Sequence, residues 1–124
     1  FMFMAGLAHF NPAMMPFYKA LMPPVFPFPD FWVHISGVVE VLCGILIVIP
    51  PTTEIGVWLT LATLVGVFPA NIVPVLMPSR REAVGMALGS ALFRLPFQAT
   101  FMLWAYQLAE LNLQQAMEIV TNYF

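Results

Sequence analysis

The feature that most constrains the fold is an apolar stretch at residues 30–50, which reads DFWVHISGVVEVLCGILIVIP. About 20 apolar residues are enough to cross the hydrocarbon core of a bilayer as one helix. Glu40 lies near the middle of this stretch, where an ionised side chain costs at least about 2.5–3.5 kcal/mol. Such a group usually faces the interior of a bundle, so the sequence predicts a buried partner for Glu40 on another helix.

The composition favours a membrane protein over a soluble one. The chain has 124 residues, of which 61% are hydrophobic and 8% are charged. Soluble domains carry about 25% charged residues, so a chain with this few charges cannot cover a water-facing surface. Its four basic residues form no cluster of the kind that binds nucleic acid. The sequence therefore predicts a multi-pass integral membrane protein, with one domain over residues 1–124 and the lipid bilayer around it.

The predicted fold class is all-α, a transmembrane four-helix bundle with short loops and an amphipathic C-terminal helical extension. Residues 11–29 hold six of the twelve prolines, which break helices, so they predict an interfacial loop. An aromatic anchor in the headgroup region is predicted from Phe26, Phe28, Phe31 and Trp32. The first apolar run is too short to span, and we expect it to be the second half of a first helix. The expected helices cover residues 1–10, 30–49, 54–77 and 90–108, and the tail covers 109–124.

The polar side chains of these helices are predicted to gather in one half of the bilayer, because successive helices alternate in direction. Glu40 and Arg94 have opposite charges and similar depth, so we expect them to form a buried pair. Small residues at Gly37, Gly44 and Gly66 are expected to let neighbouring helices approach closely. The predicted polar cluster comprises Glu40, Arg94, His34, Asn71, Gln98, Ser36 and His9.

Two interpretations of this cluster stay open. In the structural one, Glu40 and Arg94 clamp the bundle, and the other polar groups satisfy backbone that the prolines free. In the functional one, the cluster binds the polar headgroup of a lipid or a quinone. The sequence has no metal-ligand spacing and no nucleophile–base pair, so we predict no catalytic residue, no metal and no intrinsic cofactor. We favour the structural interpretation.

Five segments, AGLAHF, NPAMMPFYKALMPPVFPFPD, ISGVVEVLCGILIVIP, VFPAN and RLPFQ, follow one another across about residues 5–106. In this order they resemble the DoxX family of small membrane proteins. The resemblance implies a four-helix membrane bundle, with Glu40, Asn71 and Arg94 at positions of the family pattern. It also implies a link to quinone-dependent or thiol-dependent redox systems.

The function we favour is a non-catalytic accessory subunit that packs its bundle into a larger membrane complex, of the respiratory or photosynthetic type. Its partners would be other integral membrane subunits in an energy-transducing organellar or bacterial membrane, where such complexes carry out electron transport. The alternative is a DoxX-type quinone-linked or thiol-linked oxidoreductase subunit that uses a Glu40/Arg94 pocket. A channel or transporter is a weaker hypothesis, because polar residues in one half of the bilayer give no continuous pathway.

Overall fold

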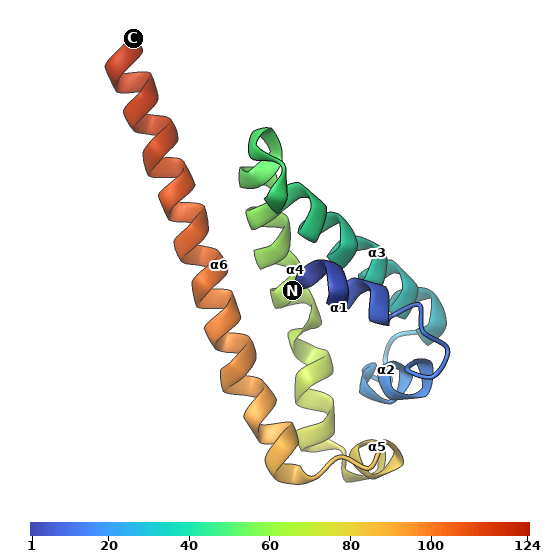
Figure 1. The fold of residues 1–124 in the computed structure, drawn as a ribbon. Coiled ribbons are helices and arrows are strands. Elements are labelled where there is room, and N and C mark those ends of the chain that lie inside the picture. Colours follow the sequence, from blue (N-terminus) through green and yellow to red (C-terminus); the bar gives the residue numbers. More distant parts are fainter.

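The computed structural model describes all residues, 1–124, and contains helices but no strands (Figure 1). The prediction of an all-α fold is confirmed. The elements are α1 (Met2–Ala8), α2 (Met15–Leu21), α3 (Pro29–Val48), the short 3-10 helix η1 (Pro50–Thr52), α4 (Thr53–Leu76), α5 (Pro78–Ala83) and α6 (Leu88–Tyr123).

Prolines set several of the helix boundaries. Pro29 occupies the first position of α3, where its missing N–H removes no helical hydrogen bond. The residue before it, Phe28, turns the chain with a φ of 55°, a left-handed conformation that few non-glycine residues adopt. Pro50 and Pro51 then close α3 and begin η1. Helix α3 therefore covers nearly the same residues that the apolar stretch predicted.

Four helices pack one after another, and Phe1, just before α1, stacks on Phe101 of α6. Helix α1 packs on α3, α3 packs on α4, and α4 packs on α6. Figure 1 shows that α3 and α4 are joined at one end by a tight turn and diverge toward the other end, where α2 and α5 lie. At that end α2 packs against α3 and α5. This arrangement sets a wall of α1 and α3 opposite a wall of α4 and α6.

Glycines allow the close crossing of α1 over α3. A Cβ atom at Gly37 would lie 2.6 Å from Cβ of His9, and one at Gly44 would lie 2.6 Å from the backbone nitrogen of Phe3. Gly6 on α1 is equally tight against α3. Gly66 differs from the prediction, because a Cβ atom there would meet nothing within 4 Å. It lies where α4 faces open space and mediates no helix packing.

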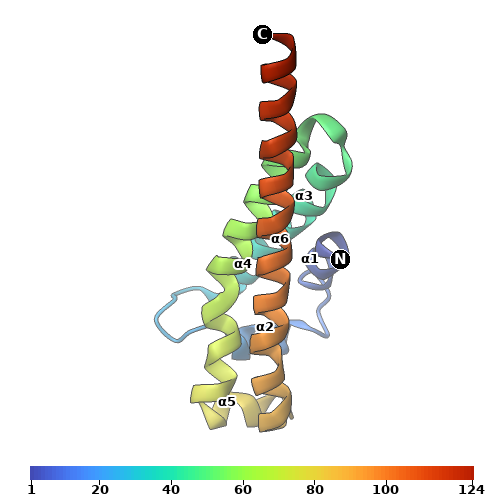
Figure 2. The ribbon, with the colours of Figure 1, turned by 90° about the vertical axis from the view of Figure 1, so that its left-hand side faces the viewer.

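Helix α6 is a single element of 36 residues, about 54 Å long at 1.5 Å per residue. The predicted helix over 90–108 and the predicted tail over 109–124 are thus one continuous helix. Ala109 is its last buried residue. Figure 2 shows the C-terminal part of α6 extending past the turn between α3 and α4, with no other helix beside it.

Two helical stretches, Pro29–Val48 and Pro50–Leu76, are long and apolar enough to cross a membrane. Only 22% of the apolar window in each is buried inside the protein, so most of each window is at least partly exposed. A helix in the core of a soluble protein would bury most of its apolar residues instead. Length and composition therefore mark α3 and α4 as candidate membrane spans.

Candidate functional site

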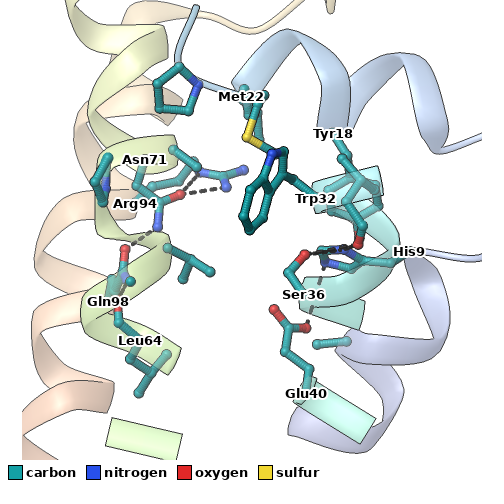
Figure 3. Close-up of a pocket in the computed structure, with 18 of the residues that line it drawn as sticks. His9, Tyr18, Met22, Trp32, Ser36, Glu40, Leu64, Asn71, Arg94 and Gln98 are labelled. Carbon is teal, nitrogen blue, oxygen red and sulfur yellow. Dashed lines mark hydrogen bonds and ion pairs between the residues drawn. The ribbon is translucent and has the colours of Figure 1, made fainter. Parts of the chain in front are cut away.

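A cavity of about 510 Å³ separates the α1–α3 wall from the α4–α6 wall (Figure 3). Its volume lies within the range of about 300–1,000 Å³ that small-molecule sites occupy. Most of its 23 lining residues are hydrophobic, and α2 contributes to one end. Polar side chains reach it from both walls and from α2, and they are His9, Tyr18, Ser36, Glu40, Asn71, Arg94 and Gln98.

The α1–α3 wall holds a pair formed by His9 and Glu40. Nε2 of His9 lies 3.6 Å from Oε2 of Glu40, and both side chains are about nine-tenths buried. Nδ1 of His9 lies 2.9 Å from the backbone oxygen of Val33 and 3.0 Å from Oγ of Ser36. Oγ of Ser36 also donates to the oxygen of Val33 at 2.9 Å. These contacts fix the imidazole ring of His9 against α3.

The hydrogen bonds determine where the protons of His9 lie. A carbonyl oxygen can only accept a hydrogen bond, so Nδ1 of His9 carries a hydrogen and donates it to Val33. An attractive contact between Nε2 and the Glu40 carboxyl then requires one more proton, which either group can hold. With that proton the pair is an imidazolium next to a carboxylate, or a neutral imidazole next to a carboxylic acid. Its net charge is zero in both forms.

Tyr18 covers this pair from α2. Its ring stacks on the imidazole of His9, with 4.0 Å between the ring centroids. Burial raises the pKa of the Tyr18 phenol, and the nearby Glu40 carboxyl raises it further. Tyr18 is therefore a neutral hydrogen-bonding group at neutral pH.

The α4–α6 wall carries a chain of hydrogen bonds that begins at Arg94. Nε and Nη2 of Arg94 donate to Oδ1 of Asn71 at 3.0 Å and 2.6 Å. Nδ2 of Asn71 donates to Oε1 of Gln98, and Nε2 of Gln98 donates to the backbone oxygen of Leu64 at 2.6 Å. This chain ties α6 to α4 in the region where Pro69 interrupts the hydrogen-bond ladder of α4.

The predicted pair of Glu40 and Arg94 is not formed. Figure 3 shows the two side chains on opposite sides of the cavity. The ion-pair partner of Glu40 is His9, and the hydrogen-bond acceptor for Arg94 is Asn71. Helix α4 packs between α3 and α6, and α3 diverges from it at this level, so similar depth in the chain does not bring the two charges into contact.

His34 lies outside the cavity, contrary to the prediction that it joins the polar cluster. Its side chain is exposed, and its Nδ1 lies 2.7 Å from the backbone oxygen of Asp30, one helical turn away. Val33, Ser36 and Glu40 recur at helical spacing on the face of α3 that meets α1 and the cavity. His34 follows Val33 directly and therefore points about 100° away from that face.

The aromatic residues that line the cavity, Tyr18 and Trp32 among them, were not predicted to do so. Tyr18 lines it because α2 folds back against α3 and α4. Trp32, which the sequence places in an interfacial anchor, also lines the cavity, and Figure 3 shows its indole between the two walls. The available signal for Tyr18 was its spacing from Leu21, the one buried residue of α2, which puts both on one face.

The fold and the cavity define a class: an all-α protein with two candidate membrane spans and a mostly apolar cavity between two polar clusters. The chain belongs to a family described as a domain of unknown function, DUF8561, whose model matches residues 1–109. The resemblance to DoxX is wrong, because the matching family model is a different one. No curated protein and no solved structure matches the sequence. The matched range ends at Ala109, the last buried residue of α6.

Proposed function

We propose that this protein is a multi-pass membrane protein whose cavity binds an amphiphilic small molecule. The polar group of the ligand would lie between the two polar walls, and its apolar part would lie among the aromatic and aliphatic lining residues. A lipid with its acyl chains or a quinone with its isoprenoid tail has this form. The observation that carries the proposal is the pair of polar walls facing one cavity of about 510 Å³.

The hydrogen bonding supports a binding site over a clamp. Each wall satisfies its polar groups internally, and no buried side-chain nitrogen or oxygen atom lacks a partner. The fold therefore needs no contact between the walls to avoid stranded polar groups. A few oriented polar groups in a largely apolar cavity are the usual design of a small-molecule site.

The rim of the cavity supports access from the outer surface. Phe26, Trp32 and Phe97 line the cavity, and their side chains are 42%, 38% and 51% exposed. Large aromatic rings at an opening favour ligands with an apolar body. In a protein surrounded by lipid, this rim gives an amphiphile an entry route that does not cross water.

Exposed apolar side chains support a four-helix transmembrane bundle of α1, α3, α4 and α6. Helix α6 exposes Phe93, Leu103 and Trp104 by more than half, and α3 and α4 expose large hydrophobic residues along their outer faces. Monomeric soluble proteins rarely expose contiguous apolar patches of this extent. A bilayer around the bundle would cover these faces.

The binding proposal is tested with Trp32 as a fluorescent reporter inside the cavity. Of the three tryptophans, Trp58 and Trp104 do not line it, so the variant Trp58→Phe/Trp104→Phe leaves one reporter at the site. The protein is purified in a neutral detergent and titrated with amphiphiles that carry bromine near the polar group. We expect saturable quenching of Trp32 that the unbrominated amphiphile reverses.

A matched variant with only Trp58 retained serves as the control for nonspecific quenching in the micelle. It should show a weak, non-saturating response. Equal, non-saturating quenching of both reporters by every amphiphile tried would contradict the proposal.

A second proposed role, an accessory subunit of a membrane complex, draws support from α6. Beyond Ala109 this helix has no buried residue, yet it continues to Tyr123. We propose that the outer faces of the bundle pack against other integral membrane subunits, in a complex of the respiratory or photosynthetic type. The test is extraction from native membranes in a mild detergent, with partners expected at fixed stoichiometry through two different separations. Recovery of the chain alone in both would refute this role.

A further inference from the structure

We propose that the ligand of the cavity is an anionic amphiphile and that Arg94 binds its carboxylate or phosphate group. This inference rests on the proposed binding function and names the chemical class of the ligand. Asn71 and Gln98 act as positioning residues, because they hold the guanidinium without neutralising it.

Arg94 is the one permanent cation among the residues that line the cavity. The titratable lining residues are His9, Tyr18, Glu40 and Arg94. Glu40 faces His9 on the opposite wall and Tyr18 is a neutral phenol, so neither is an ion-pair partner of Arg94. The guanidinium of Arg94 remains charged at any ordinary pH.

Arg94 has no acidic partner within the chain. The ion pairs of the structure are His9–Glu40 and Lys19–Asp30, so no carboxylate lies within 4.0 Å of Arg94. Its contacts are the amide oxygen of Asn71 and the ring of Phe17, 5.6 Å from the guanidinium carbon. Charged side chains inside a membrane almost always pair. An acidic group on the ligand would supply the missing counter-ion.

Arg94 keeps several N–H donors free for a ligand. A guanidinium has five N–H groups in a planar fork, and one on Nε and one on Nη2 are used by Asn71. The remaining N–H groups can bind two oxygens of a carboxylate or phosphate together, the strongest arrangement for such a pair. Figure 3 shows the guanidinium extending from the α4–α6 wall toward Trp32 and the centre of the cavity.

The side chain of Asn71 is held in one orientation. Its Nδ2 donates to Gln98, so its Oδ1 must face Arg94. Gln98 is fixed in turn by its bond to the oxygen of Leu64. The neutral amide of Asn71 therefore holds the guanidinium in one direction and leaves its charge available, which an aspartate at this position would not do.

The experiment compares one acid with its neutral ester. The single-Trp32 protein is titrated, at mildly alkaline pH, with a brominated fatty acid, with its methyl ester and with a brominated lysophosphatidic acid. Charge-assisted hydrogen bonds should make the fatty acid bind about tenfold or more tightly than its ester. If the lysophosphatidic acid binds more tightly than the fatty acid, the natural ligand is a phosphate-bearing lipid. The reverse order indicates a ligand with a free carboxylate. Either order supports the proposal that the ligand is an anionic amphiphile.

Two variants of the Arg94 cluster test the role of its charge. Arg94→Gln should reduce the affinity for the acid to that for the ester. Asn71→Asp keeps an oxygen facing Arg94 but neutralises the guanidinium, so it should abolish the preference for the acid, although it loses the hydrogen bond that Nδ2 donates to Gln98. Asn71→Asp keeps the test decisive if Arg94→Gln does not fold. Lys19→Gln, which removes a cation outside the cavity, is the matched control and should leave the affinities for the acid and the ester unchanged.

The failures are distinguishable. If acid and ester bind equally and saturably, or if Asn71→Asp keeps the full preference for the acid, the anion inference is overturned and the binding proposal stands. If no probe quenches Trp32 saturably, the proposed binding function itself fails.

Discussion

Gly66 offers the sharpest test of the cavity, because it is a helix-interior glycine with open space in front of it. A Cβ atom at Gly66 would meet nothing within 4 Å, and the residue lines the cavity. Replacing a helix-interior glycine by alanine gains about 0.8–1.0 kcal/mol of helix propensity. With no steric term against it, Gly66→Ala should raise the free energy of unfolding by roughly that amount.

Larger residues at this position should separate stability from binding. Gly66→Leu keeps most of the propensity gain, and Gly66→Phe keeps about half of it, since both side chains have room in the cavity. Ligand affinity should instead fall as the side chain grows, from Ala to Leu to Phe. The measurements are denaturant unfolding followed by circular dichroism in detergent, and quenching of Trp32 by a brominated amphiphile.

Two other glycines provide controls of opposite kinds. Gly89 also has open space in front of it but does not line the cavity, so Gly89→Ala should leave binding unchanged. Gly37 is packed against α1, with the site of a new Cβ atom 2.6 Å from Cβ of His9. Gly37→Ala should therefore destabilise the protein by about 1–3 kcal/mol through overpacking. If Gly66→Ala lowers the free energy of unfolding, or if Gly66→Phe binds the amphiphile as tightly as the unsubstituted protein, the claim that Gly66 faces an open binding cavity is refuted.

The other predictions concern the polar walls and α6. In double-mutant cycles of unfolding, His9→Ala with Glu40→Gln should show a coupling free energy of about 0.5–3 kcal/mol, because the two groups touch. Glu40→Gln with Arg94→Gln should show a coupling free energy of less than about 0.5 kcal/mol. A larger value would support the interpretation that Glu40 and Arg94 clamp the bundle. Truncation after Ala109 should leave the thermal unfolding midpoint of the bundle unchanged, because α6 has no buried residue beyond it; a fall of several degrees would show that the tail packs on the bundle.

The helices were predictable because their signals are local. Long apolar runs and proline positions placed α3 and α4 to within a few residues of their bounds. The helical extension over 109–124 was predicted as a separate tail, because hydrophobicity falls after Leu108, and the structure joins it to the preceding helix without a break. The segment QQAME has high helix propensity in any solvent, so the helix runs on to Tyr123.

The polar walls depend on which helices are neighbours, and depth along a helix does not determine that. The sequence predicted that several polar residues share one depth in the bundle, and three of them line the cavity together: Ser36, Asn71 and Gln98. His34 does not, because level says nothing of the face on which a side chain lies. The contact of α1 with α3 depends on Gly6, an ordinary small residue in the sequence whose role emerges only at the crossing.

The separation of Glu40 from Arg94 changes what the buried charges can do. Had they paired, the bundle would be closed at this level, and an apolar replacement of both would have served stability as well. Instead, Glu40 contacts His9 within its own wall, and Arg94, on the other side of the cavity, is held by the neutral amide of Asn71. A cation that is oriented but not neutralised ties α6 to α4, but in a membrane its unpaired charge would carry a substantial cost. Binding of an acidic group offsets that cost, and this is why the unmatched charge points to a ligand.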